Sequence, residues 1–280
     1  MSMIALKVIL GIAAVGYYTA TVLYWINKRR IAYITNAAAW VLNAVVVGVN
    51  WVSNGYMPFV SMYQVLTFLG LCFPLTYLYF HFINKDEWMA KYFSLCSGIV
   101  MTGVFIMNAS IIWHLPPALQ SVWFIPHVFA YMLSYSLCAV ASVFSIVYCA
   151  YPLKDRFFKN SGNPQNGNET KNNKAEENRA HLDKGAYDLI LISFPFMTMG
   201  LFFGAIWANE AWSEFWSWDI KENWALVTWA FYSIYLHCRI HKSLKKFRHI
   251  FSILGLIALL MTFQGVSFFG MNADSPHTYT

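Results

Sequence analysis

The sequence has few charged residues and no cysteine pair spaced to hold a metal. Of its 280 residues, 11% are charged and 58% are hydrophobic, whereas a soluble domain usually carries about 25% charged residues. The five cysteines form no C-x-x-C motif and lie in or beside apolar segments, so we expect neither a disulfide framework nor a thiolate metal site. Without a C-x-x-C-H motif, the chain is not itself a c-type cytochrome.

The chain contains several long apolar segments. A helix of about 20 mainly apolar residues spans a bilayer, and several segments of the chain meet this description. The predicted spans are Ile4–Ile26, Ile31–Val52, Phe59–Ile83, Tyr92–Trp113, Trp123–Ala150, Tyr187–Trp207, Trp224–Ile240 and His249–Gly270. The sequence therefore predicts an all-α polytopic membrane protein, a single integral-membrane domain over residues 1–280 with about eight transmembrane helices in the lipid bilayer.

The positive charges are distributed unevenly. Seventeen of the 19 Lys and Arg residues follow the first, third, fifth or seventh predicted helix, and only Lys7 and Lys221 lie elsewhere. The positive-inside rule places these connections in the cytoplasm and both termini outside, together with the loop before the seventh helix. The net charge of +6 thus indicates orientation in a membrane and not affinity for nucleic acid. Because Lys28–Arg30 follow the first apolar run, we expect a retained helix and not a signal peptide.

One connection, residues 152–186, is long and polar. Its middle is rich in Asn and Gly, so we expect a partly disordered cytoplasmic segment. His181, His241 and His249 lie among cytoplasmic polar residues, and a solvated face is the expected environment of each.

Half of the 12 tryptophans lie between Trp207 and Trp229. An aromatic belt at the membrane interface explains those at the predicted helix ends. It explains less well the three in the expected outer loop, residues 208–223, which are Trp212, Trp216 and Trp218. Rigid, flat indoles interleaved with polar residues favour a surface that binds a flat ligand.

Asp219 and Glu222 have the spacing of a capping box, with Asp219 as the N-cap of the next helix. This structural role does not exclude a second role in ligand binding.

Five histidines lie in or near the predicted helices or in outer segments. They are His81, His114, His127, His237 and His277. Polar residues in a membrane are costly and are candidates for function, although a His near a helix end also reaches the interface by snorkelling. Neutral imidazole is a standard ligand of haem iron. A flat tetrapyrrole on the Trp loop, ligated by histidines of flanking helices, would use both sets of residues.

The order Trp207…Trp212-x-x-x-Trp216-x-Trp218-Asp219-x-Lys221-Glu222-x-Trp224 resembles the WWD signature of haem-handling proteins in cytochrome c biogenesis. Within that superfamily the chain most resembles the CcsA (ResC) type. Segments 54–68, 117–128 and 235–239 resemble further parts of this family in the same order.

The resemblance implies a subunit that delivers haem in a system II cytochrome c synthase. Such a protein moves b-type haem, as its transported substrate, to the outer face and holds it for thioether attachment to the C-x-x-C-H motif of apocytochrome c. It works in the plasma (inner) or thylakoid membrane with a CcsB (ResB)-type membrane protein. Whether the chain itself is an enzyme is left open, since a haem-ligating holocytochrome c synthase complex is implied.

The resemblance also implies site residues. His127 and His277 would be the outer axial ligands of the iron, and His237 a ligand inside the membrane whose mate comes from the partner. The macrocycle would contact the WWD loop at Trp212, Trp216, Trp218 and Asp219.

The chain departs from the family pattern at several positions. Ser213 stands where Gly is usual, Ile220 where Pro is usual and Gln64 where Glu is usual. The tail is lengthened before His277, which makes His114 the alternative second outer ligand.

Two other functions remain open at this point. A cytochrome b-type redox subunit would favour paired histidines, such as His81 with His237. A transporter without haem would use the aromatic loop for another flat or lipidic ligand.

Overall fold

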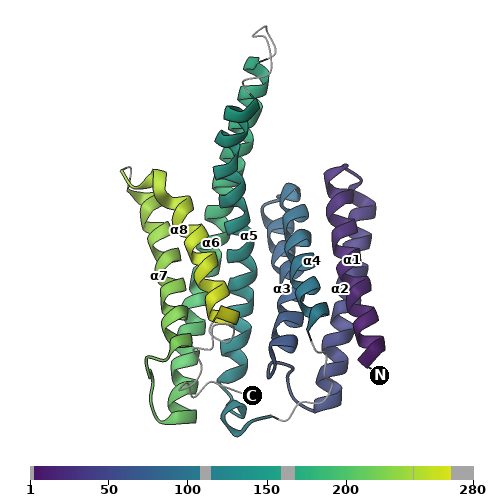
Figure 1. The fold of residues 1–280 in the computed structure, drawn as a ribbon, viewed down its shortest axis with the longest axis vertical. Coiled ribbons are helices and arrows are strands. Elements are labelled where there is room, and N and C mark those ends of the chain that lie inside the picture. The colour runs from purple at the N-terminus through teal and green to yellow at the C-terminus, as the bar shows by residue number, and fades with distance from the viewer. Residues whose placement is uncertain (1–2, 108–114, 159–167, 242, 266–280) are drawn as a thin grey trace. The chain divides into compact units, whose positions relative to one another are not determined.

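The computed structural model describes residues 3–107, 115–158, 168–241 and 243–265, which form helices with no strand among them. Short 3-10 and π segments accompany the α-helices (Figure 1). The α-helices are α1 (Met3–Trp25), α2 (Arg29–Asn54), α3 (Met62–Ile83), α4 (Ala90–Ile106), α5 (Phe124–Phe158), α6 (Asn168–Trp212), α7 (Ile220–Ile240) and α8 (Arg248–Leu260). The predicted all-α architecture is confirmed.

Seven helices in the described part of the chain are long and apolar enough to cross a membrane, judged by length and composition. The protein is therefore a multi-pass membrane protein. The helix expected over Trp224–Ile240 is present as α7, but it is not among the seven. Lys221, Glu222 and Arg239 lie near its ends, and its middle is rich in Trp and Tyr.

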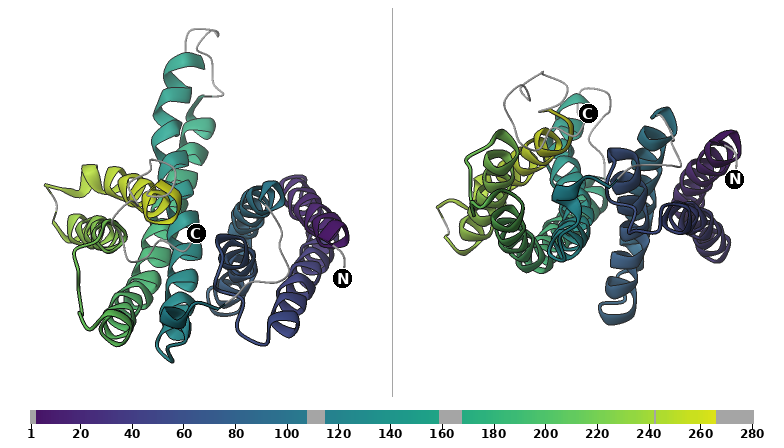
Figure 2. Two further views of the ribbon diagram at one scale, coloured as in Figure 1. Left: turned by 60° about the horizontal axis from the view of Figure 1, so that its bottom comes forward. Right: turned by 90° about the horizontal axis from the view of Figure 1, so that it is seen from below.

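The chain divides into two compact units. Unit 1 combines Met1–Ser136 with Met199–Phe215, and unit 2 combines Leu137–Thr198 with Trp216–Thr280. In unit 1, α1 packs against α2 and α4, and α3 packs against α2 and α4 (Figure 2). Buried apolar side chains of this unit, including Leu10, Tyr17 and Met101, form a common cluster.

The start of α3 shows how local sequence sets a helix end. Ser61 Oγ accepts the N–H of Gln64 at 3.3 Å, and Gln64 Oε1 accepts the N–H of Ser61 at 3.4 Å. This reciprocal pair is a capping box, which either Glu or Gln completes. Gln64 therefore caps the start of α3 through its side chain.

In unit 2, α7 packs against α8. The helices α5 and α6 both extend into the polar connection expected at residues 152–186, and their ends there run side by side (Figures 1 and 2). The middle of that connection, residues 159–167, lies outside the described residues. At its other end α6 continues to Trp212, and α7 begins at Ile220. The loop expected over residues 208–223 is thus shortened to Ser213–Asp219.

Candidate functional site

His127 lies near the start of α5, in unit 1. Its Nδ1 is 2.9 Å from the carbonyl oxygen of Gly200 on α6. A carbonyl only accepts, so Nδ1 carries the proton and the neutral ring has its lone pair on Nε2. A metal-binding histidine is commonly held in this way, with one nitrogen donating to a backbone carbonyl and the other available in the correct tautomer for ligation.

Two glycines of α6 lie against aromatic rings of α5. A Cβ built on Gly204 would lie 2.6 Å from His127 Nδ1, and one built on Gly200 would lie 3.0 Å from the ring of Tyr131. The Tyr131 ring meets His127 edge-on, with centroids 5.0 Å apart and planes at 86°. The imidazole therefore occupies space that a larger residue at position 204 would take.

Trp207 also packs against His127, with ring centroids 5.5 Å apart. Its indole Nε1 donates to the carbonyl of Ala118 at 2.8 Å, and the side chain is only 8% exposed. Trp207 meets Trp212 at 5.1 Å in an edge contact. The sequence position favoured a membrane-interface anchor for Trp207, but the buried indole instead connects elements of unit 1.

The start of α5 is tied to the end of α6. Ser121 Oγ accepts the N–H of Trp123 at 3.1 Å and donates to Glu210 Oε2 at 2.5 Å. Ser121 is buried, and a hydrogen bond to a carboxylate is stronger than one between neutral groups. The backbone that carries His127 is thereby fixed to α6.

In the loop between α6 and α7, the backbone is left-handed at two positions. Ser213, with φ 62°, follows α6, and its N–H donates to the carbonyl of Asn209 at 2.9 Å. This is the helix-ending position at which Gly is preferred. Trp218 has φ 60°, a conformation that costs a non-Gly residue about 1–3 kcal/mol.

In unit 2, Trp216 and Trp218 form an edge-to-face pair with centroids 6.1 Å apart. Trp218 is 68% exposed. Trp216 Nε1 is buried and forms no hydrogen bond with the described residues. The exposed indole of Trp218 offers a flat aromatic surface to a ligand.

Asp219 is the N-cap of α7, as predicted. Its Oδ1 accepts the N–H of Glu222 at 2.7 Å. The Glu222 carboxylate also supports this turn, because its Oε2 accepts from the N–H and the hydroxyl of Ser217, at 2.8 and 3.2 Å. Ile220 is the first residue of α7, a position that Pro also favours. Burial lowers the pKa of the Lys221 ammonium below its usual value, and the nearby Asp219 carboxylate partly offsets this.

His237 lies near the end of α7, in unit 2. Its Nδ1 donates to the carbonyl of Ser233, one turn earlier in the same helix, at 2.8 Å. The neutral ring therefore also has its lone pair on Nε2. The side chain is exposed, so its ring is not enclosed by other elements of unit 2.

The other predicted ligands are placed differently. His81 Nδ1 lies 3.4 Å from Tyr33 Oη and 3.3 Å from Tyr77 Oη in unit 1, whereas His237 belongs to unit 2. Neither unit thus contains both members of the pair expected for a b-type cytochrome. His114 and His277 lie outside the described residues. Within the described ranges no three His, Cys, Asp or Glu residues form a group that could hold a metal ion.

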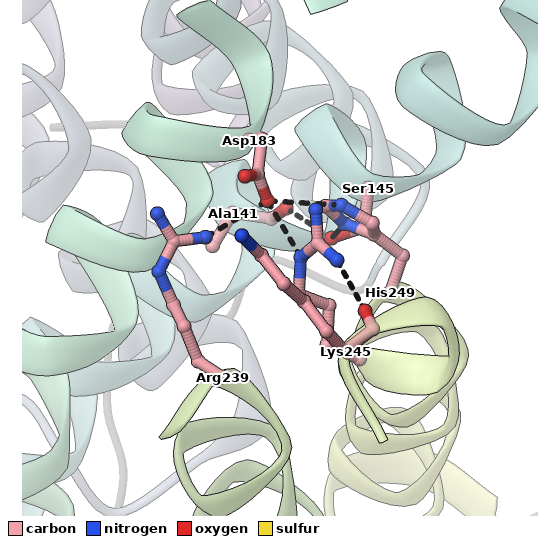
Figure 3. Close-up of polar contacts among 7 residues, drawn as sticks. Ala141, Ser145, Asp183, Arg239, Lys245 and His249 are labelled. Carbon is pink, nitrogen blue, oxygen red and sulfur yellow. Dashed lines mark hydrogen bonds and ion pairs between the residues drawn. The ribbon is translucent and has the colours of Figure 1, made fainter. Parts of the chain in front are cut away.

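Sequence reasoning missed a buried ionic cluster in unit 2 (Figure 3). Asp183 Oδ1 accepts from Arg239 Nη1 at 2.9 Å and from Arg248 Nε at 2.7 Å, and lies 3.2 Å from His249 Nε2. His249 is 2% exposed and stacks on Tyr148 at 3.9 Å, so the solvated position expected for it is wrong. The available signal was the position of Asp183, just before the predicted span Tyr187–Trp207 and among the basic residues Arg179 and Lys184.

His249 lies between Ser145 and Asp183, with its Nδ1 3.1 Å from Ser145 Oγ and its Nε2 3.2 Å from Asp183 Oδ1. The order resembles a hydrolytic triad. However, Ser145 is fully buried and donates to the carbonyl of Ala141 at 3.1 Å, and Asp183 is paired with two arginines. The cluster therefore links α5, α6, α7 and α8 within unit 2 and offers no accessible nucleophile.

The helices and the aromatic loop define a polytopic membrane protein in which a histidine, His127, packs beside tryptophans. Residues 59–272 match the family model described as cytochrome C assembly protein. The chain is 33% identical over 272 residues to the cytochrome c biogenesis protein CcsA of Guillardia theta, covering 89% of this chain and 86% of that protein. It is 30% identical over 302 residues to the CcsA of Porphyra purpurea, covering 93% of each. The CcsA of Chlamydomonas reinhardtii is 31% identical over 242 residues, or 82% of this chain and 63% of that protein.

The chain therefore belongs to the cytochrome c assembly protein family and is of the CcsA type. It acts in cytochrome c biogenesis within a membrane-embedded assembly, and this family role involves haem.

Proposed function

We propose that the protein carries haem to the non-cytoplasmic face of its membrane and presents it to apocytochrome c, where vinyl groups react with the thiols of a C-x-x-C-H motif. Haem is the substrate, and the protein contributes mainly binding and orientation. The observation that carries the proposal is the state of His127. Its tautomer is fixed by Gly200, and its ring is packed by Tyr131 and Trp207.

The roles proposed for the other site residues follow from the resemblance to the CcsA type. His127 is an axial ligand of the iron, and His277 is the second outer ligand, with His114 as its substitute. Trp212, Trp216 and Trp218 contact the macrocycle, while Asp219 contributes mainly by starting α7. His237 is a ligand for haem within the membrane.

A CcsB (ResB)-type protein is the proposed partner. The exposure of His237 is consistent with a mate for this ligand supplied from another chain.

The proposed orientation rests on the distribution of Lys and Arg. Reporter domains that distinguish the two sides of the membrane test it when fused after Lys174 and after Glu214. We expect the first reporter inside and the second outside. Both reporters on one side would contradict the orientation and the number of membrane crossings between the fusion points.

The absorption spectrum of the protein purified with its partner tests the haem assignment. We expect bound haem that is lost in His127→Ala and weakened in Trp216→Ala. The matched controls are His181→Ala and Trp51→Ala, whose side chains are exposed, and they should keep the spectrum.

Two other outcomes would replace the proposal. A tight haem with two histidine ligands, indifferent to Trp216→Ala, would favour a b-type redox subunit. No haem after expression with the partner would leave a transporter of another flat ligand.

A further inference from the structure

The surroundings of His127 on α6 contain two residues that touch the imidazole but are not expected to touch haem iron. We propose that Gly204 and Trp207 are positioning residues for His127, and that they set how tightly the protein ligates haem iron. This inference rests on the proposed function, in which His127 is an iron ligand.

Gly204 acts through the space it leaves. A Cβ at this position would lie 2.6 Å from His127 Nδ1 and 2.7 Å from Cε1. Real contacts are not that short, so the ring or the helix would have to move. Moving the ring would break the 2.9 Å hydrogen bond from Nδ1 to Gly200. Glycine weakens a helix relative to Ala, and close packing against the imidazole accounts for its place in α6.

Trp207 acts through both parts of its indole. The N–H donates to the carbonyl of Ala118 at 2.8 Å and holds the ring, while the ring packs at a tilt against His127, with centroids 5.5 Å apart. The same side chain meets Trp212, the last residue of α6. Trp207 thus joins the imidazole to the first tryptophan expected to contact haem.

The expected effect follows from how ligating histidines are held. Removing the partner that fixes the tautomer and orientation of such a histidine typically lowers metal affinity by about 10–100-fold. We therefore expect Gly204→Ala to weaken haem binding by about this factor. Trp207→Phe keeps an aromatic ring and loses only the N–H, so its effect should be smaller.

Packing of the helix bundle alone would also explain a sensitive Gly204, and a double-mutant cycle separates the two explanations. The four proteins are the native chain, Gly204→Ala, His127→Gly and the double variant, each purified with its partner. Haem affinity is measured with and without added imidazole, which replaces the missing ring in the two His127→Gly proteins. We expect Gly204→Ala to weaken binding where His127, or the imidazole that replaces its ring, fills the space beside position 204. In His127→Gly without imidazole, Gly204→Ala should not change the haem binding that remains, and an equal loss there would overturn the positioning role.

The same substitution at Gly48, in α2, is the matched control, because a Cβ there meets nothing within 4 Å. Gly48→Ala should keep native haem affinity. Native affinity in Gly204→Ala would also overturn the inference, whereas native binding in His127→Gly without imidazole would show that the proposed ligand itself is wrong. Trp207→Phe is carried through the same cycle, and its loss of affinity should likewise disappear without His127.

Discussion

The two described histidines proposed as ligands are held in opposite ways. His127 donates its Nδ1 proton to a carbonyl of another helix, and aromatic rings from α5 and α6 pack around it. His237 donates to Ser233 of its own helix and is exposed. Both rings present the same tautomer, but only His127 has its orientation fixed by tertiary contacts.

The difference indicates which of the two proposed ligands the chain itself holds in place before haem binds. A ligand enclosed by its own chain is ready before haem arrives, which lowers the ordering cost of binding. A ligand exposed on a helix of a membrane protein obtains its surroundings from lipid, from substrate or from another chain. His127 is therefore oriented by its own chain, whereas His237 depends on a partner to enclose it.

The largest expected difference between His127 and His237 is in how well added imidazole rescues their Gly variants. His127→Gly and His237→Gly should each abolish covalent haem attachment to a co-expressed apocytochrome c, measured by haem staining. Added imidazole should restore much of the activity in His127→Gly, because the surrounding rings leave a shaped space. Rescue should be weaker in His237→Gly. Equal rescue would remove the distinction, and normal attachment in His237→Gly would remove that residue from the site.

The next largest effect concerns how α7 is held near His237. Asp183→Asn leaves Arg239 and Arg248 without a carboxylate in a largely buried cluster. Removing one partner of such a network costs about 3–5 kcal/mol, which thermal unfolding of the purified protein should detect. Glu177→Gln is the control, since its 4.0 Å contact with His181 is exposed and worth at most about 1 kcal/mol. Matching stabilities would show that Asp183 does not hold these helices together.

A smaller effect is expected where α5 meets α6. Ser121→Ala removes a hydrogen bond to the Glu210 carboxylate, for which about 1.5–3 kcal/mol is typical. Because this contact fixes the segment that carries His127, haem affinity should fall as well. Thermal unfolding and haem titration check the two effects. Ser121→Thr keeps the hydroxyl and should retain most of both, whereas unchanged affinity in Ser121→Ala would show that His127 does not need this contact.

The sequence predicted the helices well because apolar runs of bilayer length leave few alternatives. Local signals also succeeded where a few neighbouring residues decide the structure, as with Asp219 at the start of α7. The loop was predicted too long, because the left-handed Ser213 that ends α6 gives no signal in an apolar pattern.

Contacts between distant segments could not be predicted. The Gly204–His127 contact depends on the rotation of one helix against another, which a single sequence does not specify. Asp183 and His249 are far apart in the chain, and both lie among charged residues that favour a solvated interpretation. Burial of such groups becomes favourable only when several helix ends supply charged partners together, a condition set by tertiary packing.

The smallest expected effect separates the two roles considered for Asp219. Its carboxylate caps α7 through the Glu222 N–H, so Asp219→Ala should cost about 1 kcal/mol. Asp219→Asn should cost little, because Asn is an equally good N-cap. If capping is the whole role, haem affinity in Asp219→Asn stays native while Asp219→Ala loses stability in thermal unfolding. Lower haem affinity in a fully stable Asp219→Asn would instead show that the negative charge acts on the substrate, and the loop would then contribute electrostatics as well as aromatic surface.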